Sequence, residues 1–358
     1  MIWNPFKKAP QSFLGVDIGT FSIKIVELSR WGQRKKLENY GEIQAESLYE
    51  KPFRTFEKST LTVSGSDVVN AISAILSESR MKTKKAFFSI PDFSSFFTTF
   101  ELPPMTEEEL PQAVQYEARQ HIPLPLSEIT LDWQIVGGEK ALAAKQQSGF
   151  KILLVAVPNE VIQQYQDIAL EAKLELLSLE AEVFGPVRAL TKGTAAVTLV
   201  DIGARSSTIN IVDGGILKVS HSFDTAGNDF TDVVSKGLGV DYREAEALKR
   251  KYGIKSNLQE VNTRELILPL IDLILDEIKK ISQNFYRTEN KEIQKVILVG
   301  GVAFLPGLAD YFSETLGKPV EIANPFADIY YPPILENILK EMGPSFAIAV
   351  GLALRGLE

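Results

Sequence analysis

The chain has 358 residues, with 38 Lys or Arg against 46 Asp or Glu, and a formal net charge of −8 at pH 7. Hydrophobic residues make up 45% and charged residues 23%, which is typical of a folded protein of about two domains. The acidic balance disfavours nucleic acid as the main ligand, because Lys and Arg clusters bind phosphate backbones. With no cysteine and two histidines, thiol catalysis, disulfides and Cys/His zinc sites are excluded.

Membrane-spanning and secretory segments are not indicated. No run reaches the ~18–20 apolar residues of a membrane helix. The first residues, MIWNPFKK, lack the apolar core of a signal peptide. We therefore expect a cytoplasmic protein with a flexible leader over residues 1–11.

Strands and helices are then predicted in chain order. Residues 12–19 form an apolar run that ends in Asp17 and Gly19, and residues 20–28 alternate like a second strand of a hairpin. A third strand is expected over 37–44 and a helix over 67–79. Residues 85–175 have a different texture, with an aromatic strand region, a helix over 107–120, a strand over 151–157 and a helix over 159–172. We predict an inserted α+β subdomain there.

The opening pattern returns in the second half of the chain. VDIGTFS at residues 16–22 aligns without a gap to VDIGARS at residues 200–206. Each follows an apolar strand and precedes an alternating one. An Asp-x-Gly turn alone is weak evidence, but two in matching settings indicate two similar halves.

Two such turns could hold a triphosphate with Mg²⁺. Glycine lets backbone N–H groups approach phosphate closely, and Mg²⁺ keeps several waters and few protein ligands. Asp17 and Asp201 would face each other across a cleft, one from each half. A third element, residues 295–307, is a buried strand ending in Gly300 and Gly301. It could pass a flat base along exposed backbone or be a close-packed turn.

These motifs resemble the phosphate-1, phosphate-2 and adenosine motifs of the actin/Hsp70/sugar-kinase ATPase superfamily. Residues 242–253 also resemble a helix of the cell-division protein FtsA in which a Glu and a Lys flank the adenosine. The resemblance implies ATP and Mg²⁺ as ligands, with Asp17 and Asp201 as indirect metal ligands. The nucleotide-binding residues that it implies are Asp17, Gly19, Thr20, Phe21, Ser22, Lys24, Gly203, Ala204, Arg205, Ser206, Glu246, Lys249, Gly300, Gly301, Val302 and Phe304.

Three stretches are similar to the type IV pilus assembly protein PilM family: residues 13–28, 115–124 and 349–356. This resemblance implies an α/β, actin-like fold of two domains, each a ribonuclease-H-like duplicate, with an FtsA-type 1C α+β insertion. The expected ranges are 12–84, 176–194 and 338–358 for subdomain 1A, and 85–175 for 1C. Subdomain 2A takes 195–236 and 291–337, and 2B takes 237–290.

The family resemblance implies a scaffold of the inner-membrane platform of the type IV pilus, or of a related type II secretion system. ATP would hold the closed state, and the N-terminal cytoplasmic peptide of the membrane protein PilN would dock between 1A and 1C. Other platform proteins and motor ATPases are further expected partners, and self-association stays open. The protein would lie at the inner face of the cytoplasmic membrane. It would contact the membrane only through partners, because the FtsA-type C-terminal amphipathic helix is not seen.

Two other functions remain open at this point, a small-molecule kinase of the same superfamily and a filament-forming ATPase like FtsA. If ATP is hydrolysed, the superfamily uses a polar residue in the first connecting segment to orient water. Here Glu182 is the first candidate and Glu180 the second, acting with Asp201, and turnover is expected to be slow at most.

Overall fold

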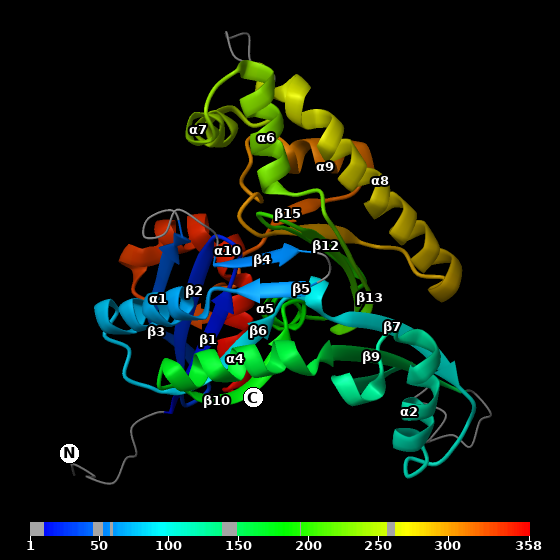
Figure 1. The fold of residues 1–358 in the computed structure, drawn as a ribbon. Coiled ribbons are helices and arrows are strands. Elements are labelled where there is room, and N and C mark those ends of the chain that lie inside the picture. Colours follow the sequence, from blue (N-terminus) through cyan, green and yellow to red (C-terminus); the bar gives the residue numbers. More distant parts are fainter. Residues whose placement is uncertain (1–10, 46–52, 58–59, 138–148, 194, 256–261) are drawn as a thin grey trace.

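The computed structural model describes residues 11–45, 53–57, 60–137, 149–193, 195–255 and 262–358. They form two α/β halves and a smaller subdomain beside them (Figure 1). The predicted leader lies almost entirely outside the described residues.

The first half is a six-stranded sheet with helices on both faces. Its strand order is β10-β6-β1-β2-β3-β16. The strands are β1 (Ser12–Ile18), β2 (Ser22–Trp31), β3 (Arg34–Gln44), β6 (Lys85–Ile90), β10 (Glu175–Ala181) and β16 (Ile329–Tyr330). A separate two-stranded hairpin, β4 (Arg54–Glu57) and β5 (Thr60–Val63), belongs to the same part of the chain.

Alternation along the strands sends side chains to two different cores. Leu14, Val16 and Ile18 pack with α1 (Gly65–Glu78) and α4 (Asn159–Glu171) on one face. On the other face lie α5 (Phe184–Leu190) and α10 (Glu336–Arg355), and Val26 and Leu28 pack against α10. The buried β1–β2 hairpin is thus fixed from both sides.

The second half has a five-stranded sheet of order β13-β12-β11-β14-β15. Its strands are β11 (Val197–Ile202), β12 (Ser207–Asp213), β13 (Ile216–Phe223), β14 (Lys295–Val299) and β15 (Val320–Ile322). Its helices are α6 (Gly227–Leu238), α7 (Tyr242–Tyr252), α8 (Thr263–Glu289) and α9 (Leu308–Leu316). Apolar side chains of α6, α8 and α9 share one core with the sheet.

The two sheets have the same topology, which confirms the predicted duplication. β1 pairs antiparallel with β2 and parallel with β6, as β11 does with β12 and β14. The next strand outward is parallel in both, β10 beside β6 and β15 beside β14. The third strand of each half, β3 or β13, pairs antiparallel with the second.

The inserted subdomain is a three-stranded sheet, β7 (Phe96–Leu102), β9 (Phe150–Pro158) and β8 (Ile129–Gly137), in the order β7-β9-β8. It packs its own core with α2 (Leu110–His121). β6 and α4 lie outside it, although the sequence-based range 85–175 includes them. Their apolar side chains join the core of the first half. Likewise β16 pairs with β3 of the first half, although the range 291–337 placed it in the second.

This subdomain also contacts the second half. Lys218 of β13 donates to the carbonyl of Val136 in β8, and Lys151 of β9 forms an ion pair with Glu289 of α8. Val136 and Leu153 pack in one apolar cluster with Leu217 of β13. The inserted subdomain therefore packs against the second half, in addition to its contact with the first half between β9 and α4.

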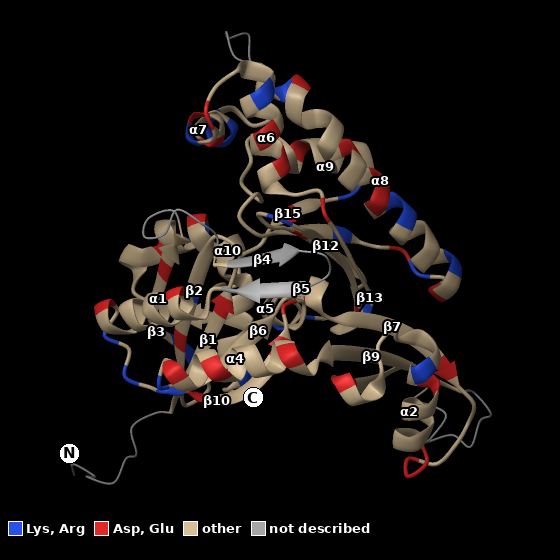
Figure 2. Ribbon diagram, in the orientation of Figure 1, with Lys and Arg blue, Asp and Glu red and all other residues tan. Residues whose placement is uncertain are grey.

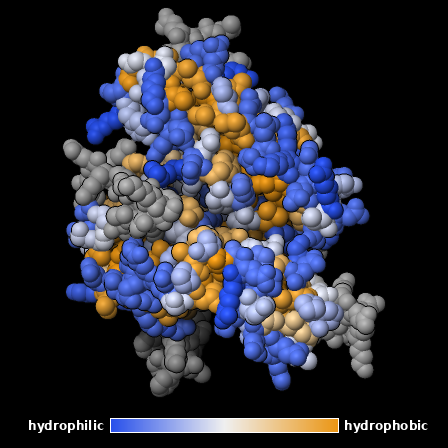
Figure 3. All heavy atoms as spheres, turned by 45° about the vertical axis from the view of Figure 1, so that its right-hand side comes forward, coloured by the Kyte–Doolittle hydropathy of each residue, from blue (hydrophilic) through white to orange (hydrophobic). Residues whose placement is uncertain are grey.

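Two surface properties complete the fold. Among the described residues no helix is long and apolar enough to cross a membrane. On the face shown in Figure 3, apolar patches are islands separated by hydrophilic side chains.

Candidate functional site

A cleft of about 860 Å³ lies between the two halves. Except for Glu180, all the residues that the sequence singled out for nucleotide, metal or catalysis line it, from both hairpin turns, β14, α7 and the segment after β10. The structure therefore brings together positions that are up to 287 residues apart in the sequence, from Asp17 to Phe304.

The two hairpin turns close with the same hydrogen bond. Gly19 N donates to Ser22 O at 2.9 Å, and Gly203 N donates to Ser206 O at 3.1 Å. A Cβ on Gly19 would lie 2.8 Å from Ser22 O, and one on Gly203 would lie 2.9 Å from Ser206 O. No side chain fits at either glycine without movement. The two turns therefore match in their hydrogen bond and in their need for glycine, as well as in sequence.

The first wall carries a buried ion cluster. Asp17 is 4% exposed, and its Oδ1 accepts a hydrogen bond from Ser89 of β6 at 3.0 Å. Lys24, directly opposite Asp17 on β2, donates to Ser22 Oγ at 2.5 Å and lies 3.6 Å from Glu42. Lys24 is 8% exposed, so its charge is held in place at the cleft wall.

The second wall has no cation at the matching position. Thr208 stands opposite Asp201, and its hydroxyl contacts that of Ser222 at 3.2 Å. Gly300, at φ +86°, packs so closely on Asp201 that a Cβ there would overlap Oδ1 of that carboxylate. Gly300 N also donates to Pro344 O of α10 at 3.0 Å, which ties β14 to the first half.

Helices α6 and α7 add a second charged group at the cleft. Lys249 is 6% exposed and contacts Glu246 at 2.5 Å, Thr231 Oγ1 at 2.9 Å and Gly227 O at 3.0 Å. Burial lowers the pKa of Lys249, more than the Glu246 carboxylate raises it. Burial would raise the pKa of Glu246, but Lys249, Thr231 and Arg250 together hold it below its ordinary value. The two side chains therefore form a largely buried Lys–Glu pair at the cleft.

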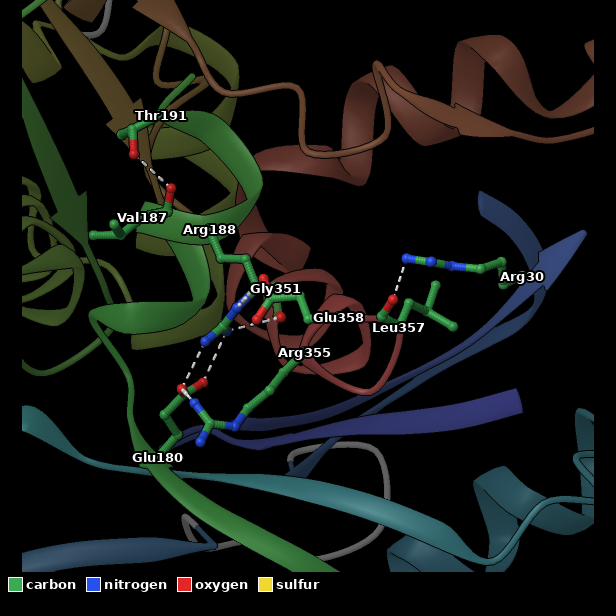
Figure 4. A network of polar contacts seen from close by, with 9 residues as sticks. All are labelled: Arg30, Glu180, Val187, Arg188, Thr191, Gly351, Arg355, Leu357 and Glu358. Atoms are coloured by element: carbon green, nitrogen blue, oxygen red, sulfur yellow. Dashed lines mark hydrogen bonds and ion pairs between the residues drawn. The ribbon is translucent and has the colours of Figure 1, made fainter. Parts of the chain in front are cut away.

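Glu182 and Glu180 are in different environments, although only two positions separate them. Glu182 lines the cleft, just after β10. Glu180 instead accepts from Arg188 of α5 at 2.7 and 2.8 Å and pairs with Arg355 of α10 (Figure 4). The prediction that Glu180 is the second hydrolytic candidate is therefore wrong, because that carboxylate is committed to joining α5 to α10.

Some cleft residues were missed by the sequence analysis. Asp92, 6% exposed, lines the cleft beside Glu182, and its Oδ1 accepts from Val183 N at 3.2 Å. The available signal was its place just after β6, which is parallel to β1 and beside it. Thr208 and Asn210 follow the second turn with period-2 spacing, which predicts that they share a face with Asp201 across the hairpin.

The cleft fits a phosphate-bearing ligand. Its turns present glycine backbone, and Lys24, Lys249 and the N-terminus of α6 at Gly227 supply positive charge. Asn210 is 2% exposed, and its Oδ1 has no hydrogen-bond partner among the described residues, so the wall also offers an acceptor to water or to a hydroxyl group of a ligand. In the described part of the chain no group of three or more His, Cys, Asp or Glu could by itself hold a metal.

Comparison with protein families gives one match over nearly the whole chain. The family model of the type IV pilus assembly protein PilM matches residues 15–357. Among curated proteins, the cell-division protein FtsA of Bacillus subtilis is 25% identical over 175 residues, 44% of this chain and 37% of FtsA. FtsA of Streptococcus pneumoniae is 27% identical over 177 residues, 44% of this chain and 36% of FtsA. The chain thus matches little more than a third of these relatives' length.

Solved structures show the same fold. A PilM–PilN type IV pilus biogenesis complex superposes with a TM-score of 0.82 at 23% identity, covering 98% of this chain and all of that one. The ethanolamine utilization protein EutJ of Carboxydothermus hydrogenoformans has a TM-score of 0.57 at 18% identity, covering 98% and 91%. MreB5 of Spiroplasma citri bound to AMPPNP has a TM-score of 0.53 at 14% identity, covering 96% and 95%. The predicted actin-like α/β fold is confirmed.

Proposed function

The chain belongs to the type IV pilus assembly protein PilM family, and from that premise we propose that it is an ATP-binding scaffold of the inner-membrane assembly platform. ATP would bind between the two halves and favour their closed arrangement. A ligand shifts such an equilibrium only by binding one arrangement more tightly. A cleft with contacts on both halves meets that requirement.

The pair of matching turns carries the nucleotide proposal. Gly19 and Gly203 sit in the same turn geometry on opposite walls, each two residues after an aspartate that lines the cleft. The phosphates would lie between them, within reach of Lys24, and the base would lie toward Glu246, Lys249 and Gly301. AMPPNP bound to the similarly folded MreB5 supports this choice of ligand.

Mg²⁺ would be held mainly by phosphate oxygens and water, with Asp17 and Asp201 contacting that water. This arrangement agrees with the small number of protein ligands that Mg²⁺ takes in nucleotide sites. The ion would neutralise charge between the phosphates and these two carboxylates.

The peptide partner is proposed to be the N-terminal cytoplasmic segment of PilN, lying between the first half and the inserted subdomain. The named complex of PilM with PilN supports this partner class. β7 is an edge strand of the three-stranded sheet, and an extended peptide can pair with such an edge.

Binding of a labelled peptide from this segment, with and without Mg-ATP, tests the scaffold. We expect saturable binding that tightens with Mg-ATP. Asp17→Asn should abolish Mg-ATP binding and the nucleotide effect while leaving the thermal melt in place. Asp276→Asn, an exposed position on α8, is the matched control and should change neither. Retained nucleotide affinity in Asp17→Asn would overturn the phosphate assignment, and no peptide binding in either condition would favour small-molecule phosphate transfer instead.

Glu182 is proposed to orient the attacking water in any slow hydrolysis, with Asp201 acting through the metal. Glu182→Gln should lower single-turnover phosphate release by about a hundredfold, the scale of a lost general base, without weakening ATP binding. Glu128→Gln, at an exposed position remote from the cleft, should leave the rate unchanged. An unchanged rate in Glu182→Gln would remove this residue from the mechanism.

A further inference from the structure

The end of the six-stranded sheet that faces away from the cleft carries a group of exposed basic and apolar side chains to which the proposed function assigns no role. β1, β6 and β10 run parallel, and β2 runs against β1, so their registers fix which residues share an end. Ser12, Trp31, Arg34 and Lys85 lie at this end, whereas Asp17 lies at the other. We call this the basal end.

The basal end is strongly basic in an acidic protein. Three segments make its turns: 29–36 between β2 and β3, 79–85 before β6, and 171–175 before β10. They contain nine Lys or Arg against two Glu, a net charge of +7, while the whole chain carries −8. Figure 2 shows blue segments gathered there, at the lower left of the molecule.

Most of these cations are available to a partner. Arg34, Arg80, Lys82, Lys84 and Lys173 are exposed. None of the five forms an ion pair with another described residue. Elsewhere, exposed lysines such as Lys280 and Lys340 are paired with glutamates on their own helices. These five charges are therefore not neutralised by an ion pair within the described part of the chain, whereas Lys36 of the same end is paired with Glu38.

Two large apolar side chains accompany this charge. Trp31, at the tip of the β2–β3 hairpin, is 65% exposed. Leu170, at the end of α4 that leads into the turn before β10, is 75% exposed. An indole ring among lysines is typical of groups that settle at the headgroup level of a bilayer.

We propose that the basal end binds directly to the surface of a membrane rich in anionic lipid. Lys and Arg side chains would attract the headgroups, and Trp31 and Leu170 would enter the interface. Weak charge attraction joined to shallow apolar insertion gives reversible surface binding, without a spanning helix. This differs from the expectation that the membrane is reached only through partners, and it does not rest on nucleotide or peptide binding.

Lipid fits this surface better than nucleic acid does. A duplex would be read by charge alone and would leave Trp31 and Leu170 in water, whereas an anionic bilayer engages both kinds of side chain. The cleft lies at the opposite end of the sheet, so a membrane-bound molecule would keep it open to nucleotide.

Co-sedimentation of the full chain with vesicles tests the proposal. We expect binding to phosphatidylcholine vesicles that contain phosphatidylglycerol, weakening as salt is raised, and little binding to phosphatidylcholine alone. Lys82→Gln with Lys84→Gln should weaken it about tenfold or more. Trp31→Ala should weaken it at any salt concentration. Lys236→Gln with Lys280→Gln is the control of equal charge change on exposed sites of the second half, and it should bind like the wild type.

Three results would overturn the proposal. They are no binding to the anionic vesicles at low salt, equal binding to the neutral ones, or equal losses in the basal and control variants. Binding of duplex DNA through the same lysines without vesicle binding would assign the surface to nucleic acid. Each variant changes exposed side chains, and a thermal melt checks that it is folded.

Discussion

The hairpins of the two halves have the same backbone conformation, but their side chains make different contacts. Lys24 stands opposite Asp17 in the first half, and Thr208 stands opposite Asp201 in the second. From the neighbouring parallel strand, Ser89 donates a hydrogen bond to Asp17, while Val299 beside Asp201 is apolar. A duplicated turn has thus been kept while its surroundings diverged. Immediately around the aspartates, the first half supplies Lys24 and the hydrogen bond from Ser89, and the second supplies close packing through Gly300.

The largest expected effect comes from filling the space beside Asp201. Gly300→Ala forces a Cβ onto the carboxylate at φ +86°, and overpacking and left-handed backbone strain together should cost about 2–5 kcal/mol. Mg-ATP binding should be lost as well. Denaturant unfolding measures the cost. Gly214→Ala is the control, since it has φ +61° with nothing within 4 Å, and it should cost only about 1–2 kcal/mol. Equal costs would show that packing on Asp201 does not matter.

A smaller effect should separate the two residues opposite the aspartates. Lys24→Met removes a buried cation, and Mg-ATP affinity should fall about ten- to hundredfold, the scale of a charged hydrogen bond. Thr208→Val replaces a neutral hydroxyl by a methyl group in a side chain of the same size, and it should lower Mg-ATP affinity by about fivefold or less. Titration calorimetry on both variants gives the comparison. Equal losses would mean that the two walls bind phosphate alike.

The smallest effect concerns Ser89. Ser89→Ala should destabilise the fold by about 1 kcal/mol and weaken Mg-ATP binding severalfold, because Asp17 loses the group that orients it. Ser29→Ala is a close match, since Ser29 donates to the carboxylate of Glu38 at 2.6 Å at the basal end of the same sheet. It should show the same loss of stability without any change in nucleotide affinity. A lower nucleotide affinity in Ser29→Ala would mean that a loss of stability at the basal end weakens binding at the cleft without any contact to Asp17.

The sequence predicted what depends on short spacing. Strand alternation and the two Asp-x-Gly turns sufficed for both hairpins, while other cleft residues such as Glu246 and Lys249 came from the family resemblance. Partners that are distant in the chain could not be derived in this way. Ser89 lies 72 residues from Asp17, and Arg355 lies 175 residues from the Glu180 that it holds. The extent of the insertion was overestimated for the same reason, because local texture does not reveal which sheet β6 joins.

α5, which comes before the first strand of the second half, and α10, which follows the second half in the chain, meet in a contact that limits how these helices can slide. Gly185 of α5 and Gly351 of α10 touch through their backbones, and a Cβ on Gly351 would collide with the carbonyl of Gly185. Side chains at a helix crossing usually act as a compliant layer that tolerates sliding, and here that layer is missing. Sliding of α5 along α10 would therefore drive backbone atoms into one another. We expect any opening of the cleft to proceed by bending where these helices end, and not by shear at their crossing.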